Sequence, residues 1–315
     1  NGDGTGDPPP MTSIPIGFGG YQSPASIHNK AAEFFGRHLD GSLGDEVRFS
    51  LDGNIIESGH KAADLLTMVE GGTLSLCYFS TSYLAERVPE FALFDLPFLI
   101  NDREQAYAAL DGPLGHILAD KLAASSGFKL LGLWDNGFRH FTNRLRLIRE
   151  PADCKGMRIR TLFSDLHTQT FRLLGFEPMV MDIKDLIAGV QDGTIDAQEN
   201  PLTNTYNFGV HNHHRHITLS SHFFGAAGLL CHNDSYLSWS AHVQHAIDEA
   251  AGAATAHQRG LASAEDTEVL PLLEKGETDI VRLNDAERAL FVEAVAPIID
   301  DQRAKFGDEL FDHLG

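Results

Sequence analysis

The sequence predicts a protein of two α/β lobes with a long C-terminal helix, and three observations support this fold class. Strand-like and helix-like segments alternate through the first two thirds of the 315 residues, which is typical of largely parallel sheets with helices on both faces. The segments Leu65–Leu74 and Leu186–Ile195 share the order helix, Gly stop, Thr and apolar strand entry. Duplication and convergence explain this similarity about equally well, but either way each half contains the same kind of unit. The final third is helical in pattern.

The alternating part consists of short apolar strands and of helices whose apolar residues recur at steps of three or four. Gly175 ends one of these helices, Gly112-Pro113 interrupts another, and a Pro-bounded loop covers Phe91–Ile100. The predicted elements are, in order, strand Ser13–Gly17, helix Ser26–Leu39, strand Glu46–Leu51, helix His60–Val69, strand Thr73–Phe79, helix Asp102–Ala123, strands Phe128–Trp134 and Met157–Thr161, and helix Asp165–Leu174.

Two long helices are predicted for the C-terminal third. Apolar residues from Trp239 to Ala254 recur at helical spacing, so we expect an amphipathic helix from Ser235 to about Lys275, far longer than the usual 11–12 residues or so. Asp285–Phe306 is the second. Helices of this length can cross between lobes and support them. We predict a tail at residues 1–12, a first lobe of residues 13–136 with about 225–265, and a second lobe of residues 137–224 with about 266–315.

The charge of the chain limits its partners. With 24 Lys+Arg against 44 Asp+Glu the formal net charge is −20, so a phosphate backbone would be repelled and nucleic acid is not expected as a partner. No apolar run approaches 18 residues, and we expect no insertion into a membrane. An anionic small ligand would have to be held by local cations against the field of the whole chain. Individual arginines are therefore informative.

The cysteines and the N-terminus bear on the compartment of the protein. Cys77, Cys154 and Cys231 lie far apart, form no CxxC pair and have apolar neighbours, so buried free thiols are expected, although one disulfide is possible. The chain begins at Asn1 without Met, and residues 1–10 are rich in Gly, Pro and Asp. A precursor whose signal peptide has been removed would begin in this way, and so would a trimmed chain.

The segment from Gly189 to Pro201 gives the strongest indication of function. Apolar residues ending in Val190 form one helical face, and Asp192-Gly193 stops this helix because Gly tolerates positive φ. A short strand, Ile195–Ala197, follows and ends in the polar cluster Gln198-Glu199-Asn200. Open α/β folds bind ligands where strand ends present polar groups. The segment therefore predicts a small-molecule site.

Two arginines could hold a carboxylate at such a site. Arg139 follows a predicted strand at a probable lobe boundary, and Arg160 ends the segment Lys155–Arg160, in which alternation puts Arg158 on the same face. A guanidinium offers a planar fork of donors that matches a carboxylate, which a Lys ammonium cannot do. The competing interpretation is that these arginines pair with surface acids.

Other side chains are candidates for the remainder of the site. The Asn200 amide can both donate to and accept from a second ligand oxygen, unless Asn200 is only a turn residue before Pro201. Aromatic and apolar residues could form the wall, although for any single one of them ordinary core packing is the favoured interpretation. These wall candidates are Phe18, Tyr21, Phe79, Trp134 and Ile183.

Metal and enzyme signatures are weak. His211, His213, His214 and His216 form an HxHHxH cluster, but no nearby carboxylate or Cys completes it, so we expect a solvated loop and no metal site. No P-loop, GxSxG, HExxH or GxGxxG motif in the right context is present. We expect no cofactor and no catalytic residue.

Four segments together resemble the extracytoplasmic solute-binding subunits of TRAP transporters, of the dicarboxylate-binding type. They occur in the order and spacing of that family, and the similarity extends from about residue 13 to 310. The four segments are Val88–Leu99, Trp134–Arg139, Pro151–Arg160 and Gly193–Pro201.

The resemblance implies a two-lobed periplasmic binding protein (Venus-flytrap) fold, with a C-terminal helix spanning both lobes, that closes on its ligand. It implies that Arg160 clamps a carboxylate, and that Arg139 and Asn200 complete the carboxylate shell. The implied function is capture of an organic acid anion in the periplasm and its delivery to the TRAP membrane permease subunits. A carboxylate sensor for a signalling receptor, or an enzyme acting on a carboxylate, are the alternatives.

The sequence departs from the family pattern at three places. Asn54–His60 replaces the usual Leu-Gly-Ser, Ile183 occupies a position that is often aromatic, and Ala197 replaces a Gly before Gln198-Glu199-Asn200. These departures concern the far end of the ligand and leave the predicted carboxylate clamp unchanged.

Overall fold

The computed structural model describes residues 13–315, which form two compact units. The first unit contains the chain up to Phe79 together with Ser126–Gly132 and Leu229–Gln258. The second contains Ser80–Ser125, Leu133–Gly228 and Arg259–Gly315. The predicted tail of residues 1–12 lies outside the described residues. The predicted lobes divide the chain at other positions, and because compact packing does not test which parts move, that division stays a prediction.

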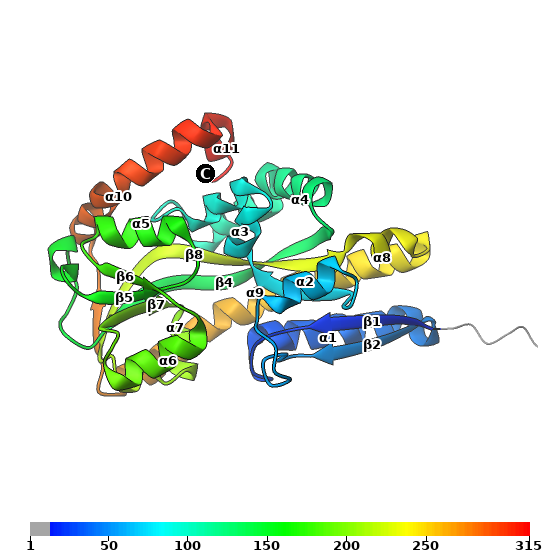
Figure 1. Cartoon of the computed structure of the whole chain (residues 1–315), viewed down its shortest axis with the longest axis horizontal. Coiled ribbons are helices and arrows are strands. Elements are labelled where there is room, and N and C mark those ends of the chain that lie inside the picture. The colour runs from blue at the N-terminus through cyan, green and yellow to red at the C-terminus, as the bar shows by residue number, and fades with distance from the viewer. Residues whose placement is uncertain (1–12) are drawn as a thin grey trace, which may run out of the picture. The chain divides into compact units, whose positions relative to one another are not determined.

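The first unit is built on parallel strands (Figure 1). Strand β1 (Ile14–Gly19) pairs in parallel with β2 (Val47–Asp52) on one side and with β3 (Leu76–Ser80) on the other. Its helices are α1 (Ile27–Leu43), α2 (Asp64–Glu70), α8 (Asn233–Ser238) and the first part of α9 (Ala241–Glu274). A short 3-10 helix η1 (Gly44–Glu46) connects α1 to β2.

Aromatic packing joins α1 to the sheet of the first unit. The rings of Phe18 and Phe35 lie 5.9 Å apart, and that of Phe49 lies 6.1 Å from Phe35. Gly36 makes this packing possible, because a Cβ at this position would come within 2.3 Å of the Phe49 ring. Ser26 caps the helix by accepting a hydrogen bond from the backbone N–H of Asn29.

The second unit contains a mixed sheet. Strand β4 (Phe128–Asn143) is antiparallel to β7 (Ala197–Asn200), whereas β5 (Arg158–Thr161) is parallel to both β6 (Glu177–Val180) and β7. The long strand β8 (His216–His232) pairs in parallel with β9 (Asp279–Arg282). Strands β4 and β8 contribute residues to both units.

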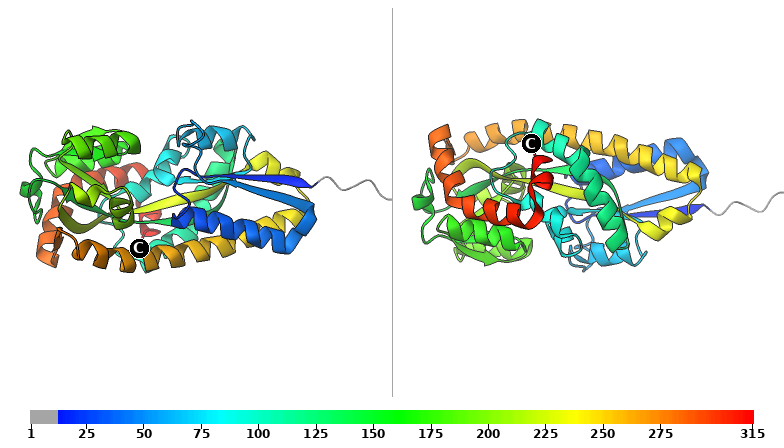
Figure 2. Two further views of the ribbon diagram at one scale, coloured as in Figure 1. Left: turned by 90° about the horizontal axis from the view of Figure 1, so that it is seen from below. Right: turned by 90° about the horizontal axis from the view of Figure 1, so that it is seen from above.

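Helices surround this sheet, and a Phe-rich core lies beneath α5 and α10. Phe141 of β4, Phe171 of α5 and Phe291 of α10 are all fully buried in one cluster. Figure 2 shows α9 as a single long helix, and its 34 residues are divided between the two units. The other helices of this unit are η2 (Thr81–Glu86), η3 (Pro89–Asp95), α3 (Arg103–Asp111), α4 (Pro113–Ser125), η4 (Pro151–Cys154), α5 (Asp165–Leu173), α6 (Ile183–Asp192), α7 (Leu202–Asn207), η5 (Val210–Asn212), α10 (Asp285–Phe306) and α11 (Asp308–Asp312).

Most predicted elements are present, including α10 with its predicted bounds. The helix predicted from Ser235 is divided into α8, which ends at Ser238, and α9, which begins at Ala241. Three further expectations are corrected. Strand β4 does not end at Trp134 but continues to Asn143, because Asp135 accepts a hydrogen bond from Gly137 N at 2.7 Å and Gly137 adopts φ +83° within the strand. Helix α2 begins at Asp64 rather than His60. The predicted loop Phe91–Ile100 begins within the 3-10 helix η3.

The three cysteines are free and buried, as predicted. Among residues 13–315, the structure has no helix that combines the length and the apolar character needed to cross a membrane.

Candidate functional site

Arg139 lies within β4, and its guanidinium is bound by the neighbouring strand β7. Its Nε donates to Oε2 of Glu199, and its Nη2 donates to Oε1 of the same carboxylate at 2.8 Å. Nη2 also donates to the carbonyl oxygen of Glu199 at 2.9 Å and to Oδ1 of Asn200 at 3.3 Å. Both members of this two-pronged ion pair are buried, Glu199 completely. The acid that holds Arg139 is therefore an interior one and not a surface acid.

A histidine on β8 occupies the other side of Glu199. His222 Nε2 lies 3.2 Å from Glu199 Oε2, and His222 Nδ1 lies 2.7 Å from the hydroxyl of Ser220. Burial lowers the pKa of His222 to about 4, so the imidazole is neutral at pH 7, with Nε2–H donating to the carboxylate and Nδ1 accepting from the hydroxyl. The ring stacks on Phe141 at 4.1 Å between centroids.

Glu199 remains ionised in spite of its burial. Burial disfavours the charged form, but the charge of Arg139 and the hydrogen bonds from His222 and Arg139 outweigh this and hold the pKa of Glu199 well below its usual range. The Arg139–Glu199 pair therefore has zero net charge across the physiological pH range.

The polar cluster Gln198-Glu199-Asn200 forms strand β7 itself and does not follow it, which corrects the predicted strand Ile195–Ala197. All three side chains are buried because β4 and the start of α7 provide their partners. Asn200 Nδ2 donates to Gln198 Oε1 at 2.6 Å, and Gln198 Nε2 donates to the hydroxyl of Thr142 at 2.7 Å. This network fixes the Asn200 amide, and within residues 13–315 one N–H of Nδ2 donates to no protein atom.

Arg160 on β5 is the second buried arginine. Its side chain is 5% exposed, and its Nε donates to the carbonyl oxygen of Met181 at 2.9 Å. Within residues 13–315 the guanidinium forms no ion pair, and neither Nη group donates to a protein atom. Burial, followed by the charge of Arg139, lowers the pKa of Arg160 to about 10, so the side chain is still cationic at pH 7. Arg160 is thus a buried charge without a counter-ion in the described chain.

Tyr83 belongs to the same electrostatic environment and is not among the residues predicted from the sequence. Burial raises the pKa of Tyr83, against the opposing charges of Arg160 and Arg139, while Asp182 adds to the rise. Tyr83 lies on η2, only four residues beyond Phe79 at the end of a predicted strand. The strand end was the only signal in the sequence that could have indicated it.

Arg158 takes no part in this group, although it lies two residues before Arg160 on the same strand. Its Nε and Nη2 each donate a hydrogen bond of 2.9 Å to the Asp196 carboxylate, and Arg144 donates one of 2.6 Å to the same carboxylate. Its Nη2 also donates to the carbonyl of Gly193 at 3.1 Å. Arg158 therefore pairs with a buried acid and fixes the turn before β7.

A second buried polar cluster is built around Asp95, which belongs to the segment Val88–Leu99. Asp95 accepts a hydrogen bond from Ser82 Oγ at 2.6 Å and one from Ser164 Oγ at 3.3 Å, and His167 Nε2 lies 3.3 Å from its carboxylate. His167 in turn stacks on Phe223 at 3.9 Å. Because Ser164 caps α5, this cluster ties η2 and η3 to the helix that follows β5.

The predicted wall residues belong to different units. In the first unit the ring of Tyr21 lies 5.0 Å from that of Phe79 and 5.3 Å from that of Tyr78. In the second unit Trp134 is fully buried on β4, and Ile183 begins α6 and packs against the small core that contains Leu186.

The histidine cluster is only in part the solvated loop that the sequence predicted: His213 is exposed and His211 is half-buried, but His214 is in the interior. His214 is fully buried, and its Nδ1 lies 3.1 Å from the hydroxyl of Thr142. His216 approaches Asp279, and His211 stacks on Tyr206. Only His214 is interior, and it lies two residues before His216, where β8 begins. Within residues 13–315, no three or more His, Cys, Asp or Glu side chains are grouped so that they could hold a metal ion.

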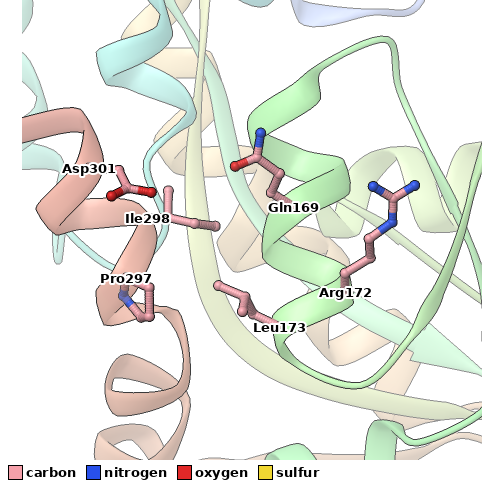
Figure 3. A pocket seen from close by; sticks show the side chains of 6 residues that line it. All are labelled: Gln169, Arg172, Leu173, Pro297, Ile298 and Asp301. Atoms are coloured by element: carbon pink, nitrogen blue, oxygen red, sulfur yellow. The ribbon is translucent and has the colours of Figure 1, made fainter. Parts of the chain in front are cut away.

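A separate open groove of about 250 Å³ lies between α5 and α10 (Figure 3). Its lining includes none of the predicted ligand residues. The residues that line it are Gln169, Arg172, Leu173, Pro297, Ile298 and Asp301.

Comparison with known proteins identifies the class of the chain. The family model described as bacterial extracellular solute-binding protein, family 7, matches residues 18–305. The chain is therefore an extracytoplasmic solute-binding protein. It belongs to family 7 of that class, the solute-binding subunits of TRAP transporters, which confirms the predicted family.

Individual relatives agree with this assignment. A solute-binding protein of Verminephrobacter eiseniae is 32% identical over 247 residues, covering 78% of this chain and 72% of the relative. The sugar acid binding protein of Advenella mimigardefordensis in complex with galactonate superposes with a TM-score of 0.89 at 28% identity, covering 96% of this chain and 97% of that chain. A TRAP periplasmic solute binding protein from Polaromonas, bound to D-erythronate, gives 0.88 at 26% identity, covering 96% and 98%. The two-lobed α/β fold is confirmed.

Proposed function

We propose that this protein captures an organic acid anion by binding its carboxylate to Arg160 and delivers it to a TRAP-type membrane permease from the periplasm. One observation carries the proposal. Arg160 is a buried, cationic guanidinium without an acid partner in the described chain, and its Nη groups are left for a ligand. A buried charge without a partner costs several kcal/mol, so such an arrangement is retained where a ligand supplies the opposite charge.

Arg139 and Asn200 complete the proposed carboxylate shell. Arg139 uses Nε and Nη2 for Glu199 and Asn200, and within residues 13–315 its Nη1 donates to no protein atom. That donor can bind a ligand oxygen while the guanidinium stays fixed by Glu199. Asn200 keeps one N–H for the same purpose. Arg160 then supplies the charge, and the other two side chains supply orientation.

The relatives support a small carboxylate as the ligand. Solved neighbours are described as bound to galactonate and to D-erythronate, and a curated relative in Escherichia coli is named as a 2,3-diketo-L-gulonate-binding periplasmic protein. We extend from these proteins to this chain the class of ligand, an acid that also carries oxygen functions along its backbone. Membership of the family supports the permease partner and the periplasmic location that we propose.

A thermal-shift screen followed by calorimetric titration tests the proposal. Sugar acids, 2-oxo acids, hydroxy acids and dicarboxylates are screened with the parent protein, and a ligand at about 100 times its Kd should stabilise the fold by about 2.7 kcal/mol. Arg160→Ala should remove the response. Arg172→Ala, which truncates an exposed arginine of the same unit, is the matched control and should bind like the parent. Equal binding by the Arg160→Ala variant would refute the clamp.

A further inference from the structure

Tyr83, on the 3-10 helix η2, brings a phenol hydroxyl close to the two buried arginines of the second unit. The charge of Arg160 acts on this hydroxyl more strongly than that of Arg139 does. The side chain is half-buried, and burial raises the pKa of Tyr83, so the hydroxyl keeps its proton at pH 7. Tyr83 can therefore donate a hydrogen bond to an anion beside Arg160.

The residue before Tyr83 fixes the position of η2. Ser82 Oγ donates to Oδ1 of Asp95 at 2.6 Å, and Oδ2 of the same carboxylate accepts from Ser164 Oγ at 3.3 Å. Ser164 lies four residues beyond Arg160 and is the N-cap of α5, the helix that follows β5. Asp95 therefore joins the segment that contains Tyr83 to the segment that contains Arg160.

The burial of Asp95 is expensive for the fold. Its side chain belongs to the interior at 6% exposure, and within residues 13–315 no lysine or arginine pairs with it. Its remaining partner is His167, whose Nε2 lies at 3.3 Å and whose ring is stacked on Phe223. Apolar side chains of similar volume could join the same elements at a lower cost in desolvation. What a carboxylate adds is direction, because each oxygen accepts from one particular hydroxyl.

A phenol hydroxyl next to a guanidinium suits a carboxylate ligand. Within the described residues the two Nη groups of Arg160 donate to no protein atom. A carboxylate has about four acceptor positions, so it can bind the guanidinium with some of them and accept from a phenol with another. The bond from the phenol is charge-assisted and shorter than a neutral one. Tyr83 thus adds a donor without adding a charge.

We propose that Tyr83 is a further ligand-binding residue, whose hydroxyl donates to the carboxylate held by Arg160, and that Asp95 is the positioning residue that fixes η2 for this contact. This inference rests on the proposed function, since it concerns the ligand of the same site. Asp95 itself touches no ligand and acts through Ser82 and Tyr83.

Titration calorimetry tests the contact. The probes are D-galactonate, D-erythronate, pyruvate and succinate, one for each class of acid in the screen, and the tightest binder is used for the variants. Tyr83→Phe should raise its Kd by about tenfold to a hundredfold, because one charge-assisted hydrogen bond is lost. Tyr206→Phe removes the hydroxyl of a half-buried tyrosine that stacks on His211 in the same unit, and it should keep the parent Kd.

The outcomes separate this inference from the proposed function. A folded Tyr83→Phe protein with the parent Kd overturns the inference and leaves the proposed function intact. If none of the four acids binds the parent protein, the proposed function fails, and the inference with it.

A double-mutant cycle tests whether Asp95 acts through Tyr83. Asp95→Ala should raise the Kd of the same acid by about tenfold in the parent but by less than about twofold in the Tyr83→Phe protein, where the contact is already missing. Asp95→Asn keeps an acceptor for Ser82 and should restore most of the affinity. Asp165→Ala, at an exposed position at the start of α5, is the matched control and should keep the parent Kd.

Circular dichroism establishes that each variant is folded before titration. If Asp95→Ala does not fold, Ser82→Ala takes its place in the cycle, since it removes the hydroxyl through which Asp95 holds the residue next to Tyr83. A merely structural role would raise Kd by the same factor in both backgrounds. That result, with either variant, overturns the positioning role of Asp95.

Discussion

At the scale of single residues, the site combines one satisfied ion pair with one unsatisfied charge. Glu199 is neutralised by Arg139 and hydrogen-bonded to His222, whereas Arg160 is buried and, among the described residues 13–315, has only a backbone carbonyl as hydrogen-bond partner. The two arginines therefore have opposite consequences for stability. Replacing Glu199 leaves the charge of Arg139 buried without its counter-ion, which destabilises the fold. Replacing Arg160 removes a buried charge that has no counter-ion, which stabilises the ligand-free fold.

The first prediction is that Arg160→Met stabilises the ligand-free protein. The pKa of Arg160 falls from 12.5 to about 10 on folding, which corresponds to a cost of about 3 kcal/mol for burying the charge. Loss of the hydrogen bond to Met181 returns about 1 kcal/mol, so a net gain of about 1–3 kcal/mol is expected. Urea unfolding without ligand measures it, with Arg172→Met as the exposed control. A less stable Arg160→Met protein would contradict the assignment of an unpaired buried charge.

The second prediction concerns the pair. Glu199→Ala should destabilise the protein by about 3–5 kcal/mol, because Arg139 then remains buried without its counter-ion. Glu293→Ala on the exposed face of α10 should change stability by less than about 0.5 kcal/mol. Both free energies come from the same urea titrations. Similar effects of the two substitutions would mean that water reaches Arg139 and compensates its charge.

The sequence could single out Arg160, Arg139 and Asn200 as candidate ligand residues because their segments match a family pattern. It could not identify their partners. Glu199 lies 60 residues from Arg139 and 23 from His222, so the pairing depends on which strands become neighbours. The local sequence pattern instead predicted that Glu199 belongs to a polar cluster at the end of a strand.

At the scale of elements, the link from α6 to β7 positions the site. Helix α6 ends at Gly193 with φ +79°, and the next residues form a turn held by Asp196, which binds Arg158 and Arg144. Strand β7 then places Glu199 opposite Phe141 of β4. The stop at Gly193 was predictable from Asp192-Gly193, because a left-handed C-cap favours Gly for a steric reason.

The third prediction follows from this geometry. Gly193→Ala should cost about 1–2 kcal/mol, because the left-handed backbone is unfavourable for a residue with a Cβ, although the added Cβ would meet only Arg144 Cζ at 3.9 Å. Gly252→Ala is the matched control: it lies in α9 with no atom within 4 Å of the added Cβ, and it should stabilise by about 0.5–1 kcal/mol. Opposite signs in thermal unfolding are the expected result, and equal signs would contradict the backbone argument.

Strand β8 shows where sequence patterns fail at this scale. Twelve of its 17 residues, from His216 to His232, are buried and the other five are half-buried, and neither alternation nor helical spacing appears. The His-rich segment before it indicated a solvated loop. Without β8, His222 could not be placed beside Glu199, and the neutral environment of the site could not be foreseen.

At the scale of the whole molecule, buried neutral histidines make the protein sensitive to acid. Burial lowers the pKa of four histidines, to about 3 for His140 and to about 4 for His28, His214 and His222. Their unfolded pKa is 6.5, so the unfolded chain binds more protons than the folded one between these values. The stability that they contribute is complete above pH 6.5 and is lost as pH falls through this window.

The fourth prediction is therefore a steep loss of stability between pH 6.5 and pH 4. Each buried histidine contributes a slope of up to about 1.4 kcal/mol per pH unit near pH 5, and below about pH 4 protonation of Glu199 and Asp196, whose pKa values are lowered by folding, adds to the loss. Urea unfolding at pH 7, 6 and 5 measures the slope. His222→Gln should make it shallower by about one proton, whereas His245→Gln, whose side chain is 73% exposed, should leave it unchanged. A parent protein as stable at pH 5 as at pH 7 would show that these imidazoles already carry their protons in the folded state.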